Sequence, residues 1–280
     1  MIVSFHPCFR GDRNLICAGR APGHKELLAI RGADAVVLPQ GCSRALYEMA
    51  KRNCPNVFPN YDARFEYPDK LDQIRLFRDN GLPHPKTFIY SSVRDFSNQY
   101  GFSPPAGPFE FPFVFKLAWG GEGDTVFLIC SEEQLRGAVN QARMHEKSGQ
   151  AGFLIQQYVP TNRSLRLVLV GEKVFSYWRL QEDCHRFGTS VLKGARIDPD
   201  VDPKIGAGAE AYLLDFCRKT GINLAAFDVL FTADRQKSPL FLEINYYFGR
   251  RGLGGSEKFY RILLTEITGW LNGLGLSVKN

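Results

Sequence analysis

Two acidic residues and an amide stand on apolar, strand-like runs near the end of the sequence. Asp228 lies in "AAFDVLFT", and Glu243 and Asn245 lie in "PLFLEIN". If the two runs pair as a hairpin that turns through "ADRQKS", Asp228 falls opposite Glu243, and Asn245 shares the face of Glu243. Two buried carboxylates repel each other unless a cation joins them, and such oxygen ligands suit Mg²⁺. A pair of polar residues on a half-exposed hairpin is the alternative interpretation.

A lysine and three glycines form a second candidate site. Lys116 ends the apolar run "FPFVFK", and Gly120, Gly121 and Gly123 follow in the turn "GGEGD". Glycines let backbone N–H groups approach phosphate oxygens, and a lysine adds a positive charge to the same group. The stretch is not a P-loop, because the order G-K-[ST] is missing. An ordinary glycine-rich hairpin turn with a surface-reaching lysine is the alternative.

Strands and helices must position these residues, and the first of them are expected in residues 1–68. There, short apolar runs alternate with two stretches of helical spacing, "APGHKELLAIRG" and "CSRALYEMAKRN", which predicts a small α/β unit. A Pro- and Asn-rich connection follows. A helix is then expected to begin at Asp69, which can cap it, and to end at Gly81.

The rest of the chain is predicted to form two further parts, residues 69–150 and 151–280. Ser131 with Gln134 resembles a capping box that opens a helix. Strand-like runs such as "RSLRLVLVG" and "KVFSYWRL", joined by a turn at "VGEK", indicate an antiparallel hairpin. Hairpins mixed with helices favour an α+β fold over a doubly wound parallel sheet.

Composition excludes several classes of protein. In 280 residues, hydrophobic and charged fractions of 44% and 23% are those of a folded globular chain. The net charge of +6 is spread along the chain, which does not favour nucleic acid as a partner. The sequence has neither a secretory leader nor an apolar run of about 20 residues, so we expect no membrane segment. For the same reasons we expect a cytoplasmic location. Seven scattered cysteines without a C-x-x-C pair indicate reduced thiols and neither a disulfide framework nor a zinc site.

Six segments in a fixed order carry a family resemblance. They are "DKLDQIRLFRDNGLPHPKTF", "FPFVFKLAWGGEGDTVFLI", "FLIQQYVP", "SLRLVLVGEKVFSYWR", "FDVLFT" and "FLEIN". This order resembles the ATP-grasp fold, and most of all the branch of the ribosomal-protein glutamate ligase and glutathione synthetase. The resemblance covers roughly residues 60 to 270. It implies two α+β subdomains that clasp ATP, preceded by a small α/β domain.

The resemblance implies a role for each residue at a matching position. Lys70 and Lys116 would contact the phosphates of ATP, and the loop 120–124 would close over the triphosphate. Arg166 and Lys193 would stand near the phosphates and the acyl-phosphate site. The hinge that binds adenine, largely through backbone groups, would be Gln156, Gln157, Tyr158 and Val159. The ligands of Mg²⁺, or of Mn²⁺ in its place, would be Asp228, Glu243 and Asn245, with Glu243 bridging two ions.

The chain departs from the family pattern at several positions. Gln157 stands where relatives often have Glu, and Ser164 stands where the branch often has Asp. The first difference affects contacts to ribose or adenine, and the second affects the placement of substrate or nucleotide. After Asn245, relatives often have a small residue and then Ser-Pro-Gly, whereas this chain has "YYFGRRGLGG". Arg250 and Arg251 in that loop either hold an acidic substrate bidentately or are solvated loop residues.

The activity that the resemblance implies is ATP- and Mg²⁺-dependent ligation of a carboxylate to an amine or thiol. The γ-phosphoryl group would pass to the carboxylate, the nucleophile would attack the acyl phosphate, and ADP and phosphate would be released. Substrates would be small molecules or peptides. Both a monomer and a homo-oligomer are compatible with the sequence, and ATP-grasp relatives often associate. A small-molecule kinase and a non-catalytic nucleotide-binding module are the alternatives. His185 is either an acceptor-side contact or an exposed loop residue.

Overall fold

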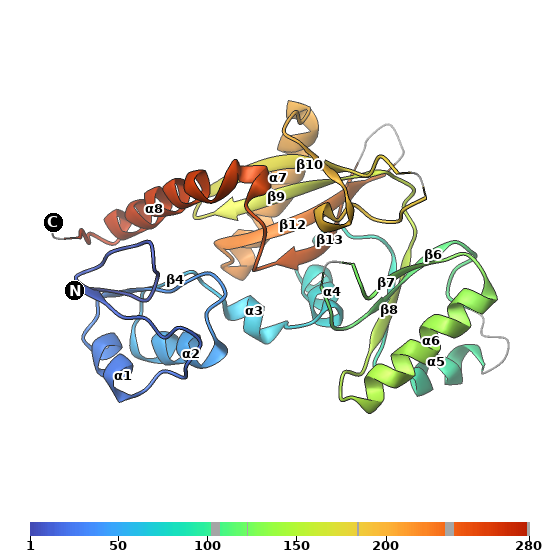
Figure 1. The fold of residues 1–280 in the computed structure, drawn as a ribbon, viewed down its shortest axis with the longest axis horizontal. Helices are drawn as coiled ribbons and strands as arrows, with labels where there is room; N and C mark the ends of the chain where they lie inside the picture. The colour runs from blue at the N-terminus through green and yellow to red at the C-terminus, as the bar shows by residue number, and fades with distance from the viewer. Residues whose placement is uncertain (102–106, 122, 184, 233–237, 279–280) are drawn as a thin grey trace.

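The computed structural model describes residues 1–101, 107–121, 123–183, 185–232 and 238–278. Within these ranges the chain forms three β-sheets. Figure 1 shows the N-terminal sheet at one end of the molecule, near both termini, and helices α5 and α6 at the opposite end. The sheet formed by residues 163–245, called the third sheet below, lies between these two ends. No helix in these ranges is long and apolar enough to cross a membrane.

The N-terminal sheet is parallel, as expected for a small α/β unit. Its strand order is β2-β1-β3-β4, and the apolar runs predicted as strands form its buried centre, β1 and β3. Two very short strands that the sequence did not indicate complete the two edges. The elements are β1 (Ile2–Ser4), β2 (Arg13–Asn14), α1 (His24–Arg31), β3 (Ala35–Val37), α2 (Arg44–Asn53), β4 (Val57–Phe58) and α3 (Asp62–Glu66).

The second sheet along the chain, called the middle sheet for its place in the sequence, is antiparallel and has the order β5-β8-β6-β7. Its elements are β5 (Thr87–Tyr90), α5 (Val93–Tyr100), β6 (Phe113–Leu117), β7 (Val126–Ile129), α6 (Glu132–Lys147) and β8 (Phe153–Gln157). Ser131 caps α6 as predicted, because its Oγ accepts from the Gln134 N–H at 3.3 Å. The reciprocal bond of a capping box is displaced by one residue, since Gln134 Oε1 accepts from the N–H of Cys130 at 2.7 Å and not from that of Ser131. Because β8 pairs with β5 and β6, we propose to move the boundary predicted at residue 150 to the end of β8.

The third sheet is also antiparallel, with the order β11-β10-β9-β12-β13. Its elements are β9 (Arg163–Val170), β10 (Lys173–Leu180), η1 (Val191–Lys193), β11 (Arg196–Asp198), α7 (Pro203–Thr220), β12 (Leu224–Phe231), β13 (Pro239–Asn245), η2 (Arg251–Leu253) and α8 (Gly255–Gly273). The hairpin of β9 and β10 turns where "VGEK" predicts it. The predicted turn "ADRQKS" lies outside the described residues, except for its last residue.

The two faces of the third sheet are covered unequally. Leu165, Leu167 and Leu169 of β9 belong to the same buried cluster as the apolar side of α7. Val168 and Val170 point to the other face and share a cluster with α8. Side chains alternate along a strand, so Ser164 and Arg166 point to the face of α8, on the part of the sheet that α8 leaves uncovered. This polar part of the sheet forms the floor of the site described below.

Helix α4 (Lys70–Asp79) joins the middle and third sheets. Asp69 caps it, as predicted, and its carboxylate accepts from the Asp72 N–H at 2.9 Å. The Lys70 N–H donates to Ala118 O just after β6 at 3.2 Å. One turn later, the Gln73 amide accepts from the Ile244 N–H at 2.9 Å and donates to Ile244 O at 3.2 Å. These bonds occupy the outer edge of β13 and hold the helix against both sheets.

The Gln73→Ala variant should lower the free energy of unfolding by about 1–3 kcal/mol, because it removes two hydrogen bonds and leaves a buried N–H of Ile244 without a partner. Chemical denaturation measures the change. Gln141→Ala, on the exposed side of α6, is the matched control and should cost less than about 0.5 kcal/mol. Equal stability of both variants would show that the amide does not tie α4 to β13.

Candidate functional site

A cleft of about 780 Å³ lies between the middle and third sheets. Every residue predicted for the site lines it except His185. The His185 side chain is exposed, and its backbone N–H donates to Asp183 Oδ1 at 2.9 Å. Segments that are far apart in sequence, such as those carrying Lys70 and Arg251, therefore meet around one cavity.

Four residues on the cleft floor form one row across the third sheet. Tyr177 on β10 pairs with Arg166 on β9, Arg166 with Asp228 on β12, and Asp228 with Glu243 on β13. The predicted pairing of Asp228 with Glu243 is thereby confirmed. Asp228 is only 4% exposed, so the alternative of a half-exposed polar hairpin does not apply to it.

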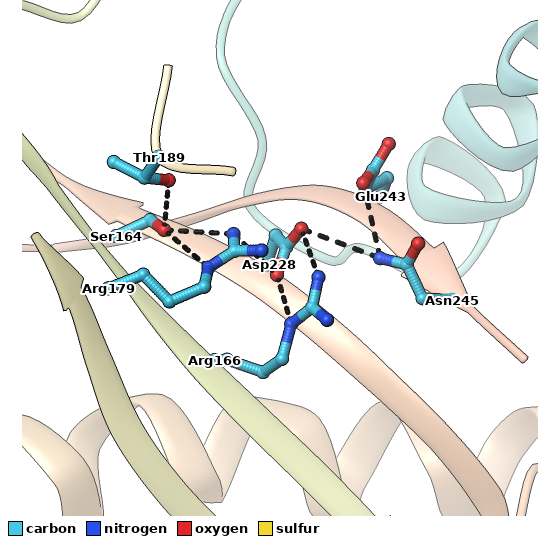
Figure 2. A network of polar contacts seen from close by, with 7 residues as sticks. All are labelled: Ser164, Arg166, Arg179, Thr189, Asp228, Glu243 and Asn245. Carbon is cyan, nitrogen blue, oxygen red and sulfur yellow. Dashed lines mark hydrogen bonds and ion pairs between the residues drawn. The ribbon is translucent and has the colours of Figure 1, made fainter. Parts of the chain in front are cut away.

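Asp228 is held by two arginines (Figure 2). Arg166 binds it bidentately, with Nε 2.8 Å from Oδ1 and Nη2 2.9 Å from Oδ2. Arg179 Nη2 lies 2.8 Å from Oδ1. Burial raises the pKa of Asp228, but the positive charges of Arg166 and Arg179 outweigh that effect and lower its pKa below the ordinary value. The carboxylate therefore stays ionised inside the protein.

Arg179 was not among the predicted site residues. It pairs across the β9–β10 hairpin with Ser164, whose hydroxyl accepts from Arg179 Nε and Nη2 at 3.2 and 2.9 Å. Thr189 Oγ1 lies 2.6 Å from the same hydroxyl. The signal was present in the sequence: with the turn at "VGEK", the hairpin register places residue 179 opposite 164 and residue 177 opposite 166.

The three metal ligands implied by the resemblance differ in whether they have an oxygen available for a divalent cation. Asn245 Nδ2 donates to Glu243 Oε1 at 3.2 Å and to Asp228 Oδ2 at 3.4 Å, which leaves the amide oxygen of Asn245 available (Figure 2). Glu243 and Asn245 thus offer oxygens to a cation, whereas both oxygens of Asp228 face guanidinium groups. The described residues contain no group of three His, Cys, Asp or Glu suited to a metal. An ion held here would depend on the amide as a ligand.

Two lysines add positive charge to the cleft. Lys116 is 8% exposed, and its pKa is lowered to about 8. Burial is the main cause, the charge of Lys70 acts in the same direction, and the charge of Glu243 opposes both. Burial also lowers the pKa of Lys70. Lys70 Nζ donates to Gly120 O at 2.5 Å, so this lysine contacts the start of the glycine loop.

The glycine loop is positioned over the cleft and contacts a second loop. Gly120 has a φ of +112°, and a Cβ at this position would lie 2.5 Å from the Thr125 side chain, so glycine is required. Asp124 forms an ion pair of 2.9 Å with Lys193 of η1. Both side chains are substantially exposed, so this pair contributes little to stability.

The predicted adenine hinge connects β8 to β9. The Gln156 side chain is buried and donates from Nε2 to Thr87 Oγ1 at 2.9 Å. The Gln157 N–H donates to Lys86 O at 2.8 Å. These bonds hold the start of the hinge in place, and Tyr158 and Val159 follow it along the wall of the cleft. The aromatic ring of Phe187, which the sequence did not indicate, lies 6.2 Å from that of Tyr158.

The loop "YYFGRRGLGG" closes the other end of the cleft. The Arg250 guanidinium lies 5.1 and 4.5 Å from the ring centroids of Phe259 and Tyr260. Within the described residues, no carboxylate lies within ion-pair distance of Arg250. His6 packs against Tyr260, and burial together with the charge of Arg250 lowers the pKa of His6 to about 4. His6 is thus neutral at pH 7, and Arg250 is a preorganised cation that has no carboxylate partner in the described part of the chain.

The same loop needs a glycine where it crosses the cleft floor. A Cβ on Gly252 would lie 2.2 Å from the Tyr177 ring, so only glycine allows the backbone to pass this close. Tyr177 is 3% exposed and begins the row that contains Asp228. The loop and the polar row are therefore packed against each other.

Residues 68–266 match a family described as the RimK-like ATP-grasp domain. The chain is 23% identical over 175 residues to mitochondrial pyruvate carboxylase of Homo sapiens, an alignment that covers 59% of this chain and 13% of that protein. It is 28% identical over 144 residues to the uncharacterized protein MG012 homolog of Mycoplasma pneumoniae, covering 49% of this chain and 44% of that protein. The chain thus spans less than half the length of these curated relatives.

Solved structures share the fold. A RimK-domain ATP-grasp protein from Sphaerobacter thermophilus has a TM-score of 0.62 at 16% identity, over 95% of this chain and 98% of that chain. D-cycloserine synthetase has a TM-score of 0.59 at 17% identity, over 91% and 88%. VanG D-Ala:D-Ser ligase from Enterococcus faecalis has a TM-score of 0.60 at 14% identity, over 85% and 73%.

These similarities confirm the expected fold, an α+β ATP-grasp architecture. The family match begins just before α4, the helix that brings Lys70 to the cleft, and it ends within α8. It includes the glycine loop, the hinge and the polar row of the third sheet. The chain belongs to the RimK-like ATP-grasp family.

Proposed function

We propose that the chain is an ATP- and Mg²⁺-dependent ligase that joins a carboxylate to an amine or thiol through an acyl phosphate. The observation that carries the proposal is the convergence on one cleft of the polar row with its buried Asp228, two lysines and a glycine loop. Such a set suits phosphoryl transfer, in which the protein mainly positions groups and neutralises charge. The ligases among the structural neighbours support the same reaction class.

In this mechanism the protein binds and orients the reacting groups. Lys70 and Lys116 neutralise the phosphates of ATP, while the glycine loop offers backbone N–H groups to them. The γ-phosphoryl group passes to a carboxylate oxygen, and ADP is the leaving group. The nucleophile then attacks the carbonyl carbon, loses its proton, and phosphate departs. Arg166 and Lys193 offset the negative charge that develops at the acyl-phosphate site.

A divalent cation completes the charge balance. Mg²⁺ or Mn²⁺, held by Glu243, Asn245 and Asp228, would neutralise phosphate oxygens as a Lewis acid when bound. We place the reaction in the cytoplasm, which maintains the reduced state expected of the cysteines.

The proposed carboxylate substrate carries a further negative charge. Arg250 lines the cleft, is held over two aromatic rings, and lacks a carboxylate partner among the described residues. An arginine prepared in this way suits a bidentate contact to a carboxylate. Arg251 lies next to it with its side chain exposed to solvent. We therefore propose an acidic small molecule or peptide as one substrate.

Product analysis tests the reaction. Purified protein is incubated with MgATP, pooled carboxylates and pooled amines, and the products are resolved by mass spectrometry. We expect ADP, phosphate and a new mass equal to acid plus amine minus water. A phosphorylated metabolite without an amine would instead identify a kinase. Nucleotide binding without turnover would favour a non-catalytic module.

The Glu243→Gln variant should abolish Mg²⁺-dependent turnover of ATP, because it removes the charged side chain that would hold the cation. Circular dichroism serves as the control for folding. Unchanged turnover in a folded variant would disprove the assigned role of Glu243.

The affinity for ATP should fall as the pH rises through about 8, since Lys116 loses its charge in that range. The expected limit is about tenfold per pH unit, measured by calorimetry between about pH 7 and pH 9. Lys116→Arg stays charged over this range and should flatten the profile. A wild-type profile that is already flat would contradict phosphate binding by Lys116.

The Arg250→Ala variant should raise the KM for the acidic substrate by about tenfold to a hundredfold, because it removes a charged hydrogen bond. The affinity for ATP should remain at the wild-type value. Arg261→Ala removes an exposed arginine of α8 that pairs with Glu257, and it is the matched control. Equal losses for ATP and the acidic substrate would contradict the role of Arg250.

A further inference from the structure

Residue 164 determines where Arg179 finds its counter-charge. Ser164 is 1% exposed and offers Arg179 a neutral hydroxyl. A neutral acceptor does not balance a guanidinium that is itself only 9% exposed. The carboxylate that balances it is Asp228, on the next strand but one, although Asp228 already binds Arg166 bidentately. Two buried arginines therefore share one carboxylate.

This sharing fills the coordination of Asp228. An ionised carboxylate has about four lone-pair sites. Oδ1 has Arg166 Nε and Arg179 Nη2 as neighbours, each at 2.8 Å. Oδ2 has Arg166 Nη2 at 2.9 Å and Asn245 Nδ2 at 3.4 Å. Figure 2 shows the carboxylate enclosed by these donors, so in this arrangement it has no oxygen to give to a metal ion.

We propose that Arg179 is a positioning residue that withholds Asp228 from the metal site until an anionic ligand draws the guanidinium away. Arg179 lines the cleft, so phosphate oxygens of a nucleoside triphosphate can approach it. When Arg179 turns to such an anion, one lone pair of Asp228 Oδ1 becomes available, while Arg166 keeps its bond to the same oxygen. The inference rests on the proposed function, because it takes Asp228 as a metal ligand.

The consequence is a site that binds metal poorly before nucleotide. Glu243 and Asn245 alone offer one charged and one neutral ligand, opposite a surplus of positive side chains. Nucleotide binding removes part of that surplus and frees a second carboxylate. Because linkage is reciprocal, metal and nucleotide should each strengthen the binding of the other. Ser164, rather than a metal ligand, sets the strength of this coupling.

Calorimetric titration of MnCl₂ into nucleotide-free protein tests the proposal. Ser164→Asp gives Arg179 a carboxylate of its own, and Arg179→Met removes the guanidinium. Each should raise the affinity for Mn²⁺ about tenfold over wild type, within the usual range of such coupling. Ser164→Asn has nearly the same shape as the Asp variant but no charge, so its affinity should stay at the wild-type value. Thermal unfolding checks that each variant is folded, and the two independent variants keep the test decisive.

A further control separates position from charge. Lys193→Met also removes one positive charge from the cleft, but Lys193 pairs with Asp124 and does not contact Asp228. Because that pair is exposed and screened by salt, the affinity for Mn²⁺ should stay within about twofold of wild type. A tenfold rise in the Mn²⁺ affinity of Lys193→Met would overturn the proposal. It would also be overturned if the Mn²⁺ affinity failed to rise in Ser164→Asp, in Arg179→Met or in both.

The metal site itself is tested separately by titrating wild-type protein with a non-hydrolysable ATP analogue, with and without Mn²⁺. Tighter binding of the analogue with Mn²⁺, combined with the rise in both variants, supports the inference. If Mn²⁺ binds neither alone nor with the analogue, in wild type and in every variant, the proposed metal site fails and the inference falls with it. If Mn²⁺ strengthens analogue binding but the variants match wild type, only the role of Arg179 is wrong.

Discussion

The burial of one ionised carboxylate is the constraint on which the site depends. Asp228 is almost fully enclosed, and a charge in that position must be matched by charges nearby. Arg166 can match it because β9 lies next to β12, and Arg179 because β10 lies next to β9. The strand order of the third sheet is therefore also the order in which its charges are compensated.

The unequal covering of that sheet creates room for chemistry. α7 closes one face with apolar side chains, whereas α8 closes only part of the other. The uncovered part is polar and becomes the cleft floor, and the middle sheet supplies Lys116 and the glycine loop from across the cavity. A firm floor of paired strands thus faces a loop that requires glycine, as at Gly120 with its φ of +112°.

Local patterns in the sequence predicted part of this arrangement. The caps at Asp69 and Ser131 and the pairing of Asp228 with Glu243 follow from short-range rules, and they were correct. The position of Arg179 could have been predicted by the same rules, since the hairpin register places it opposite Ser164. Contacts between distant segments were not predictable, because no local pattern indicates that Lys193 meets Asp124. The short edge strands β2 and β4 and the helix α5 were also missed, because elements this short contain too few residues to show a hydrophobic period.

Helix α4 sets the spacing between the two halves of the cleft. Its first residue bonds to the chain that follows β6, and Gln73 bonds to the edge of β13. Three residues of helix advance about 4.5 Å, so this first turn of α4 fixes the distance between the glycine loop and the strand of Glu243. One residue inserted into that turn would rotate the Gln73 amide by about 100° and turn it away from β13. Sequence change in this turn is thus confined to substitution, because a change in its length would alter the dimensions of the cleft.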